Sequence, residues 1–139
     1  MPKLVYEVLA EVLKAKSNKE KVQILRQNES AALRDVLRGS IDKTITWLLP
    51  TGSPPPYTPC EEHNTPSSLL RENKMLTYFA KGGKGNNLTN LKREKLFIGV
   101  LESIDPNDAL LLIDVINKKV PAGVTRKIVN EAFPGLLKD

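Results

Sequence analysis

Toward the end of the chain, a turn that begins with glycine is followed by residues that are suited to bind phosphate. Gly123, Val124 and Thr125 precede Arg126 and Lys127, so a helix start and two cations coincide. The first N–H groups of a helix lack intrahelical partners, and the helix dipole adds positive charge at the same place. This segment therefore predicts a phosphate-binding corner.

Basic residues gather at three places where one predicted helix ends and the next begins. Several such corners on one side of a protein would grip a duplex backbone without reading bases. We therefore predict a nucleic-acid surface, the alternative being that lysine simply favours exposed loops. The clusters are Lys14, Lys16, Lys19 and Lys21; Lys81, Lys84, Lys92, Arg93 and Lys95; and Lys118, Lys119, Arg126 and Lys127.

A second glycine-rich stretch spans residues 81–87. A Walker phosphate loop needs Gly-x-x-x-x-Gly-Lys-Ser/Thr between a strand and a helix. Here a predicted helix precedes the loop, and Lys84 is followed by Gly85 and Asn86. We therefore reject nucleotide binding, but glycines and lysines still suit close approach to a polyanion. The alternative is a flexible connection between helices.

The only histidine, His63, lies close to the only cysteine, Cys60, with Glu61 and Glu62 between them. Structural zinc takes four ligands, mostly Cys and His, so one of each is too few. A cysteine nucleophile needs an oriented base, and nothing nearby orients His63. We predict a solvated loop here, with no metal, no cofactor and no catalytic residue in the chain.

The composition is that of an ordinary globular domain. The chain has 139 residues, of which 40% are hydrophobic and 27% charged, and this balance is common in soluble proteins. The net charge of +5 favours acidic partners, nucleic acid first. No apolar run approaches the roughly 20 residues of a membrane span. We expect a cytoplasmic protein without a signal peptide, disulfide or membrane partner.

Helical spacing of apolar residues predominates, and no stretch alternates with period two. Ser17 and Glu20 form a predicted capping box, and Pro66 and Pro106 stand at first helical positions. We predict an all-α fold, an irregular bundle of about six or seven helices. The expected helical segments are 5–13, 17–25, 33–48 with a bend at Gly39, 65–80, 88–101, 105–116 and 123–133.

Most of these segments carry an apolar face that should point inward. Residues 110–116 are apolar nearly all round, which is typical of a central helix. The inward set includes Val5, Val8, Leu9, Val12 and Leu13; Leu33, Val36, Leu37, Ile41, Ile45 and Leu48; Leu69, Leu70, Leu76, Phe79 and Ala80; Leu88, Leu91, Ile98 and Leu101; and Ile128, Val129, Ala132 and Phe133.

Residues 50–66 interrupt the helical pattern, because six of the ten prolines lie there. Proline lacks the backbone N–H and clashes with the preceding turn, so no helix continues through this segment. Neither flank is long enough for a core of its own. We predict one domain over residues 1–139, crossed by a Pro-rich loop at 50–66.

Aromatic side chains make up only 5% of the chain. Trp47, Phe79, Phe97 and Phe133 occur at positions typical of a core. Single-strand binders stack bases on exposed aromatic rings, so duplex backbone contact is the better expectation.

The order of these motifs resembles the N-terminal, all-helical DNA-binding domain of phage-type ATP-dependent DNA ligases. The resemblance covers nearly the whole chain. Its parts are Ser17-Asn18-Lys19-Glu20-Lys21 before Ile24-Leu25 and Asn28; Leu33-Arg34-Asp35-Val36 leading to Trp47; a proline-bearing loop; Gly85-Asn86 before a long helix; and Gly123-Val124-Thr125 leading through Ile128, Val129 and Asn130 to Phe133-Pro134-Gly135-Leu136.

The resemblance implies a grip on duplex DNA across the minor groove through helix starts and backbone amides. The implied contacts are Gly123, Thr125, Arg126 and Lys127, with Ser17, Lys19, Lys21, Gly85 and Asn86 as further candidates. The chain contains no Lys-x-Asp-Gly motif, which a ligase needs for its nucleophile. We therefore expect a ligase-like domain used alone as a phage protein, without the catalytic domain.

Two function hypotheses follow. The first is a non-enzymatic, sequence-nonspecific double-stranded DNA-binding protein that assists phage DNA replication or repair. Its predicted contacts are Ser17, Lys19, Lys21, Lys84, Gly85, Asn86, Lys118, Lys119, Gly123, Thr125, Arg126 and Lys127. The second is a protein-interaction adaptor that has lost DNA binding and contacts a phage or host replication, transcription or virion protein through its Pro-rich loop.

Overall fold

The computed structural model describes residues 3–50, 52, 54, 56–61 and 65–138. These residues form seven α-helices and one 3-10 helix, with no strand and a single isolated bridge between Trp47 and Ala80. The predicted all-α bundle is confirmed. The elements are α1 (Val5–Lys14), α2 (Asn18–Gln27), α3 (Ala31–Ile41), α4 (Leu69–Glu72), the 3-10 helix η1 (Asn73–Tyr78), α5 (Asn90–Leu101), α6 (Pro106–Ile116) and α7 (Arg126–Ala132).

Helix starts in this chain are set by short polar side chains that cap the first turn. Ser17, Thr89 and Thr125 each accept a hydrogen bond from the backbone N–H three residues later. Asp105 accepts from Asn107 N, with Pro106 as the first helical residue. Because such caps satisfy otherwise unpaired N–H groups locally, the sequence indicates the starts at Ser17, Asp105 and Thr125, whereas the Thr89 cap was not predicted.

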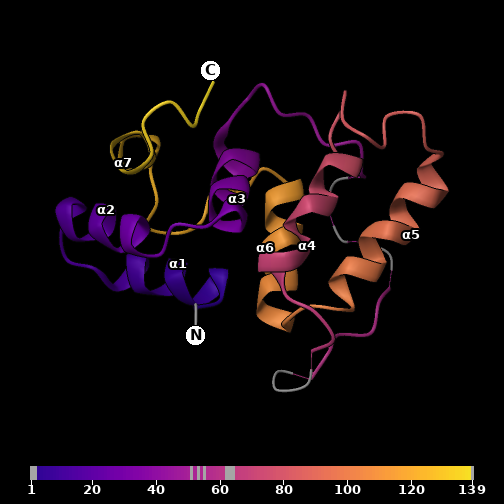
Figure 1. Cartoon of the computed structure of the whole chain (residues 1–139), viewed down its shortest axis with the longest axis horizontal. Coiled ribbons are helices and arrows are strands. Elements are labelled where there is room, and N and C mark those ends of the chain that lie inside the picture. Colours follow the sequence, from indigo (N-terminus) through magenta and orange to yellow (C-terminus); the bar gives the residue numbers. More distant parts are fainter. Residues whose placement is uncertain (1–2, 51, 53, 55, 62–64, 139) are drawn as a thin grey trace.

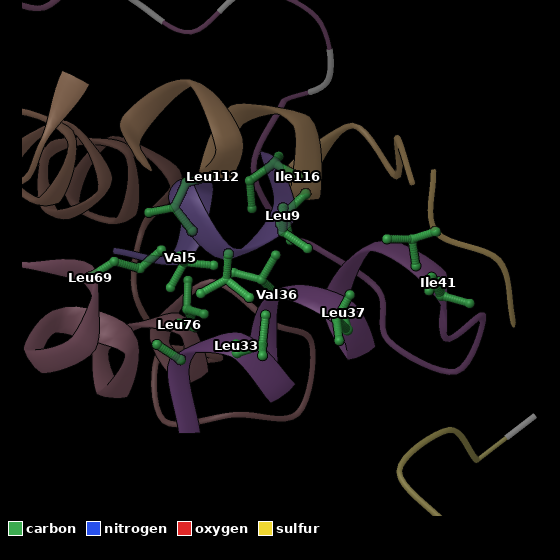
Figure 2. Close-up of a cluster of buried hydrophobic side chains, with 14 of the residues drawn as sticks. Val5, Leu9, Leu33, Val36, Leu37, Ile41, Leu69, Leu76, Leu112 and Ile116 are labelled. Atoms are coloured by element: carbon green, nitrogen blue, oxygen red, sulfur yellow. The ribbon is translucent and has the colours of Figure 1, made fainter. Parts of the chain in front are cut away.

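The core lies where α6 packs against α1, α3 and α5 (Figure 1). Figure 2 shows side chains of α1, α3 and α6 meeting there, with Leu112 near Val5 and Ile116 near Leu9. Leu112 and Val36 are fully buried. The prediction of a central helix over 110–116 is therefore confirmed, although Leu110 on its outer side is exposed.

The segment after α3 departs from the predicted helix over 33–48. α3 ends at Ile41, and Asp42 is its C-cap with extended backbone. Trp47 then lies against α3, where its Nε1 donates to the Gly39 carbonyl at 3.0 Å. Glycine at position 39 therefore leaves room for the Trp47 indole, because any side chain there would collide with the ring.

Two further helix predictions were wrong in detail. The helix expected from Thr65 and Pro66 begins at Leu69 instead, after Ser68, and continues as the 3-10 helix η1. In α5 the inward face includes Arg93 rather than Leu91, which is 64% exposed. In both cases contacts with the rest of the fold decide the result, although the local sequence also allowed the predicted helix start and the predicted inward residue.

The described part of the Pro-rich loop runs over the ends of α5 and α6. Gly52 N donates to Asn117 Oδ1 at 2.6 Å, and Thr58 N donates to Glu102 Oε2 at 2.7 Å. Among the described residues, no helix combines the length and apolar character needed to span a membrane.

Candidate nucleic-acid interface

Helices α2 and α7 pack against each other, and two side chains of α2 bind backbone carbonyls just before α7 and at its end. At their N-terminal ends, Lys21 Nζ donates to the Gly123 carbonyl at 2.8 Å. At their C-terminal ends, Arg26 donates to the carbonyls of Glu131 at 2.6 Å and Ala132 at 3.3 Å. The two helix starts therefore lie at the same end of the molecule (Figure 1).

This arrangement joins the first predicted basic cluster to part of the third. We call the combined surface the α2–α7 basic end. Its lysine side chains are exposed except for that of Lys21, which is partly buried by its bond to Gly123. Its members are Lys14, Lys16, Lys19, Lys21, Gly123, Thr125 and Lys127.

The caps of both helices are occupied by their own chain. Ser17 Oγ accepts from Glu20 N at 3.2 Å, and Thr125 Oγ1 accepts from Ile128 N at 3.3 Å. The Glu20 carboxylate accepts from Lys16 N at 3.3 Å rather than from Ser17 N. The predicted capping box is therefore only half correct, and Glu20 is held beside the lysines.

Gly123 has a packing role that the sequence did not reveal. Its φ of +82° is rarely open to other residues. A Cβ there would also lie 3.0 Å from Leu13 Cα. Glycine is thus needed because the last turn of α1 lies directly against the segment before α7. Phosphate contact by Gly123 stays a prediction.

Two of the predicted DNA-contacting cations bind the C-terminal end of α3. Lys118 Nζ donates to the carbonyls of Gly39 at 2.8 Å and Asp42 at 2.7 Å. Arg126 Nη2 donates to the Ile41 carbonyl at 3.4 Å. Cations at a helix C-terminus satisfy its last carbonyls and complement its dipole. Lys118 is exposed in spite of these bonds, as is Lys119.

Asp42 connects α3 to the C-terminal segment, and its side chain is fully buried. Burial alone would raise the pKa of this carboxyl. Hydrogen bonds from Thr44 and from Lys138 N, together with the Arg38 guanidinium, outweigh burial and lower the pKa to about 2. The Asp42 charge is thus compensated internally.

A hollow of about 500 Å³ adjoins this region. Its lining includes Lys43, Thr46, Trp47 and Lys118. Lys43 was missed in the sequence because it stands alone inside the predicted helix 33–48 rather than in a basic cluster.

The glycine loop at 81–87 is held by its own chain. The Arg93 guanidinium is buried and donates to the carbonyls of Gly85 and Leu88, each at 2.9 Å. Gly82 N donates to Asn86 Oδ1 at 2.9 Å. A Cβ on Gly85 would collide with the Tyr78 carbonyl oxygen. Arg93 is therefore structural, and the loop has a defined shape.

The glycine loop does not join the α2–α7 basic end. It precedes α5, which lies at the opposite end of the long axis from α2 and α7 in Figure 1. Lys81, Lys84 and Asn86 are exposed there. The structure thus brings together two of the three predicted clusters and separates the third.

The predicted solvated loop around Cys60 is only partly described, because Glu62 and His63 lie outside the described residues. The Cys60 thiol donates to the Glu102 carbonyl at 2.6 Å. Within the described part of the chain, no three His, Cys, Asp or Glu side chains come close enough to hold a metal ion.

Fold and site together define a small all-α protein with a lysine-rich end at helices α2 and α7. Residues 8–122 match the model of a family described as "Family of unknown function (DUF6433)", and the chain belongs to this family. The matched span begins within α1, continues through α6 and stops just before Gly123. No curated protein matches the chain.

Proposed function

We propose that this protein is a non-enzymatic binder of double-stranded DNA that contacts phosphates without reading sequence. The α2–α7 basic end is the proposed contact surface. Lys84 and Asn86, at the far end of the molecule, would be a secondary contact on a longer duplex.

One observation carries the proposal. The bond between Lys21 and Gly123 holds two helix starts together, and Lys16, Lys19 and Lys127 are exposed around them. Phosphates repeat along each strand of a duplex, so lysines from separate helices can each meet one. The buried and compensated Asp42 nearby adds little repulsion.

The resemblance to ligase DNA-binding domains also supports the proposal that the protein binds duplex DNA. If the chain acts as such a domain alone, it would assist replication or repair of phage DNA in the cytoplasm of a bacterial host. Any catalytic step would then belong to another protein.

Fluorescence anisotropy with a labelled 20-base-pair duplex tests the proposal. With on the order of four phosphate contacts, affinity should fall about 100-fold between 50 and 200 mM salt. Unrelated sequences should bind within a few-fold of one another, since phosphate contacts carry no sequence information. Absence of binding at low salt would contradict the proposal.

A further inference from the structure

A hollow of about 290 Å³ is lined by residues of α3, of η1 and of the segment that follows α3. Its volume is close to the lower end of the range for small-molecule sites. Three charged side chains line it, namely Asp35 and Arg38 of α3 and Lys74 of η1. We call this hollow the α3–η1 pocket.

The apolar wall of the pocket is held in place by backbone contacts. Trp47 and Ala80, which both line the pocket, form the isolated bridge, and next to it Leu48 N donates to the Phe79 carbonyl at 2.7 Å. The indole Nε1 of Trp47 donates to the Gly39 carbonyl at 3.0 Å. The indole therefore has a defined position beside α3, and the pocket is formed in advance of any ligand.

The acid and the base that α3 contributes are not paired with each other. Among the described residues, Asp35 Oδ2 accepts from Asn73 Nδ2 at 2.9 Å, and Oδ1 accepts no hydrogen bond. Arg38 Nε lies 3.7 Å from Asp42 Oδ2 and is buried without a hydrogen-bond partner in the described part of the chain. A guanidinium has five N–H donors, so the terminal nitrogens of Arg38 are left for a ligand.

The spacing of these two groups restricts the ligand. Asp35 and Arg38 are three positions apart on α3, and such side chains are neighbours, with about 5–6 Å between their Cβ atoms. A ligand that satisfies both must carry a cation and an anion close together. The ammonium and the carboxylate of an α-amino acid are bonded to the same carbon. Lys74 adds a second cation, which favours a carboxylate on the ligand.

We propose that the α3–η1 pocket binds a free α-amino acid with an apolar side chain. The Asp35 carboxylate accepts from the ligand ammonium, and the Arg38 guanidinium donates two hydrogen bonds to the ligand carboxylate, a geometry in which arginine is favoured. The apolar side chain of the ligand packs against Trp47 and Leu76, which line the same pocket. The inference is independent of DNA binding.

Titration of the full chain with free leucine, without DNA, tests the proposal. Trp47 is the only tryptophan, so its fluorescence reports on the pocket, and calorimetry measures the same binding independently. We expect a dissociation constant of about 1 mM or below. Isoamylamine lacks the carboxylate and isocaproate lacks the ammonium, so each should bind at least about tenfold more weakly than leucine.

Two variants assign the two charges of the ligand. Asp35→Asn should weaken leucine binding at least about tenfold but should not weaken the binding of isocaproate, which has no ammonium. Arg38→Lys keeps the charge but not the planar pair of donors, so it should weaken leucine about three- to tenfold and leave isoamylamine unaltered. Arg34→Lys is the matched control, because Arg34 is also on α3 but pairs with Glu29.

Arg38 also lies beside the buried Asp42, so circular dichroism must first show that Arg38→Lys is folded. If it is not, Asp35→Asn alone must still weaken leucine binding. The absence of any response to leucine at about 10 mM would overturn the proposal. Leucine binding that is unaltered by Asp35→Asn, or equalled by isoamylamine or isocaproate, would also overturn it, because the pocket would then not recognise both charges.

Discussion

The ammonium of Lys21 donates to the carbonyl of Gly123 across 102 positions of sequence. This bond places the start of α7 beside the first turn of α2. The lysine cluster around α2 and part of the cluster around α7, which are far apart in the chain, are thereby held next to each other. The same pairing makes α7, a helix of only seven residues, dependent on α2 for its position.

Arg26→Ala should therefore lower the free energy of unfolding. Its guanidinium satisfies the carbonyls of Glu131 and Ala132 at the end of α7. We expect a loss of about 1–3 kcal/mol, the range for hydrogen bonds made by charged groups. Urea denaturation measures it. Gln23→Ala, at an exposed position of the same helix, should change stability by less than about 0.5 kcal/mol.

Replacing two glycines with alanine should give opposite results. A Cβ on Gly39 would lie 2.6 Å from Cζ2 of Trp47 and 2.9 Å from Cγ1 of Val115. Gly39→Ala should destabilise by about 1–3 kcal/mol through overpacking. Gly99, in α5, has open space around it, so Gly99→Ala should stabilise by about 0.5–1 kcal/mol. Thermal unfolding followed by the fluorescence of the only tryptophan compares both.

Asp42→Asn should destabilise the protein at pH 7 but hardly at pH 2. The pKa of Asp42 is about 2 in the folded state and 3.8 ordinarily. A lowered pKa contributes stability above pH 3.8, and this is lost as the pH falls through 2. The shift corresponds to about 2 kcal/mol. Urea titrations of both proteins from pH 7 to pH 2 should converge; a constant difference would contradict this role.

Asp108→Asn should change the free energy of unfolding in the opposite direction and stabilise the protein at high pH. Burial raises the pKa of Asp108 to about 6, with Asp105 and Glu7 adding to the effect while the bond from Tyr6 N opposes it. Oδ2 is buried without a hydrogen-bond partner.

A raised carboxyl pKa means that stability falls as the pH rises from 3.8 through 6. Asparagine keeps an oxygen for Tyr6 N and carries no charge. The variant should be more stable than the parent by about 1–3 kcal/mol at pH 8, with little difference at pH 4. A destabilised variant at pH 8 would show that the Asp108 carboxylate is needed.

The features that the sequence predicted well are local ones. Ser17, Asp105 and Thr125 cap helices because each satisfies N–H groups two or three residues away. Helix α6 packs against α1, α3 and α5 and buries Leu112, Val115 and Ile116, whereas Leu110 and Asp114 are exposed. The caps, by contrast, depend on no distant partners.

The features that the sequence did not predict depend on contacts between residues that are far apart in the chain. Leu13 belongs to the apolar pattern of α1, yet it is exposed because α1 ends against Gly123 rather than inside the core. The bonds from the Lys118 ammonium to the end of α3 were not predicted either, and its contact with DNA stays a prediction. No spacing rule reports contacts made across such separations.

The central claim concerns where DNA binds, and the salt dependence of affinity tests it most directly. Lys16, Lys19 and Lys127 should be replaced together by glutamine, with Lys84, Lys92 and Lys95 replaced together as a control of equal charge. We predict that the first variant flattens the slope of log affinity against log salt by about 2–3, while the control changes it by less than about 1. Equal slopes for the parent and the first variant would contradict the account.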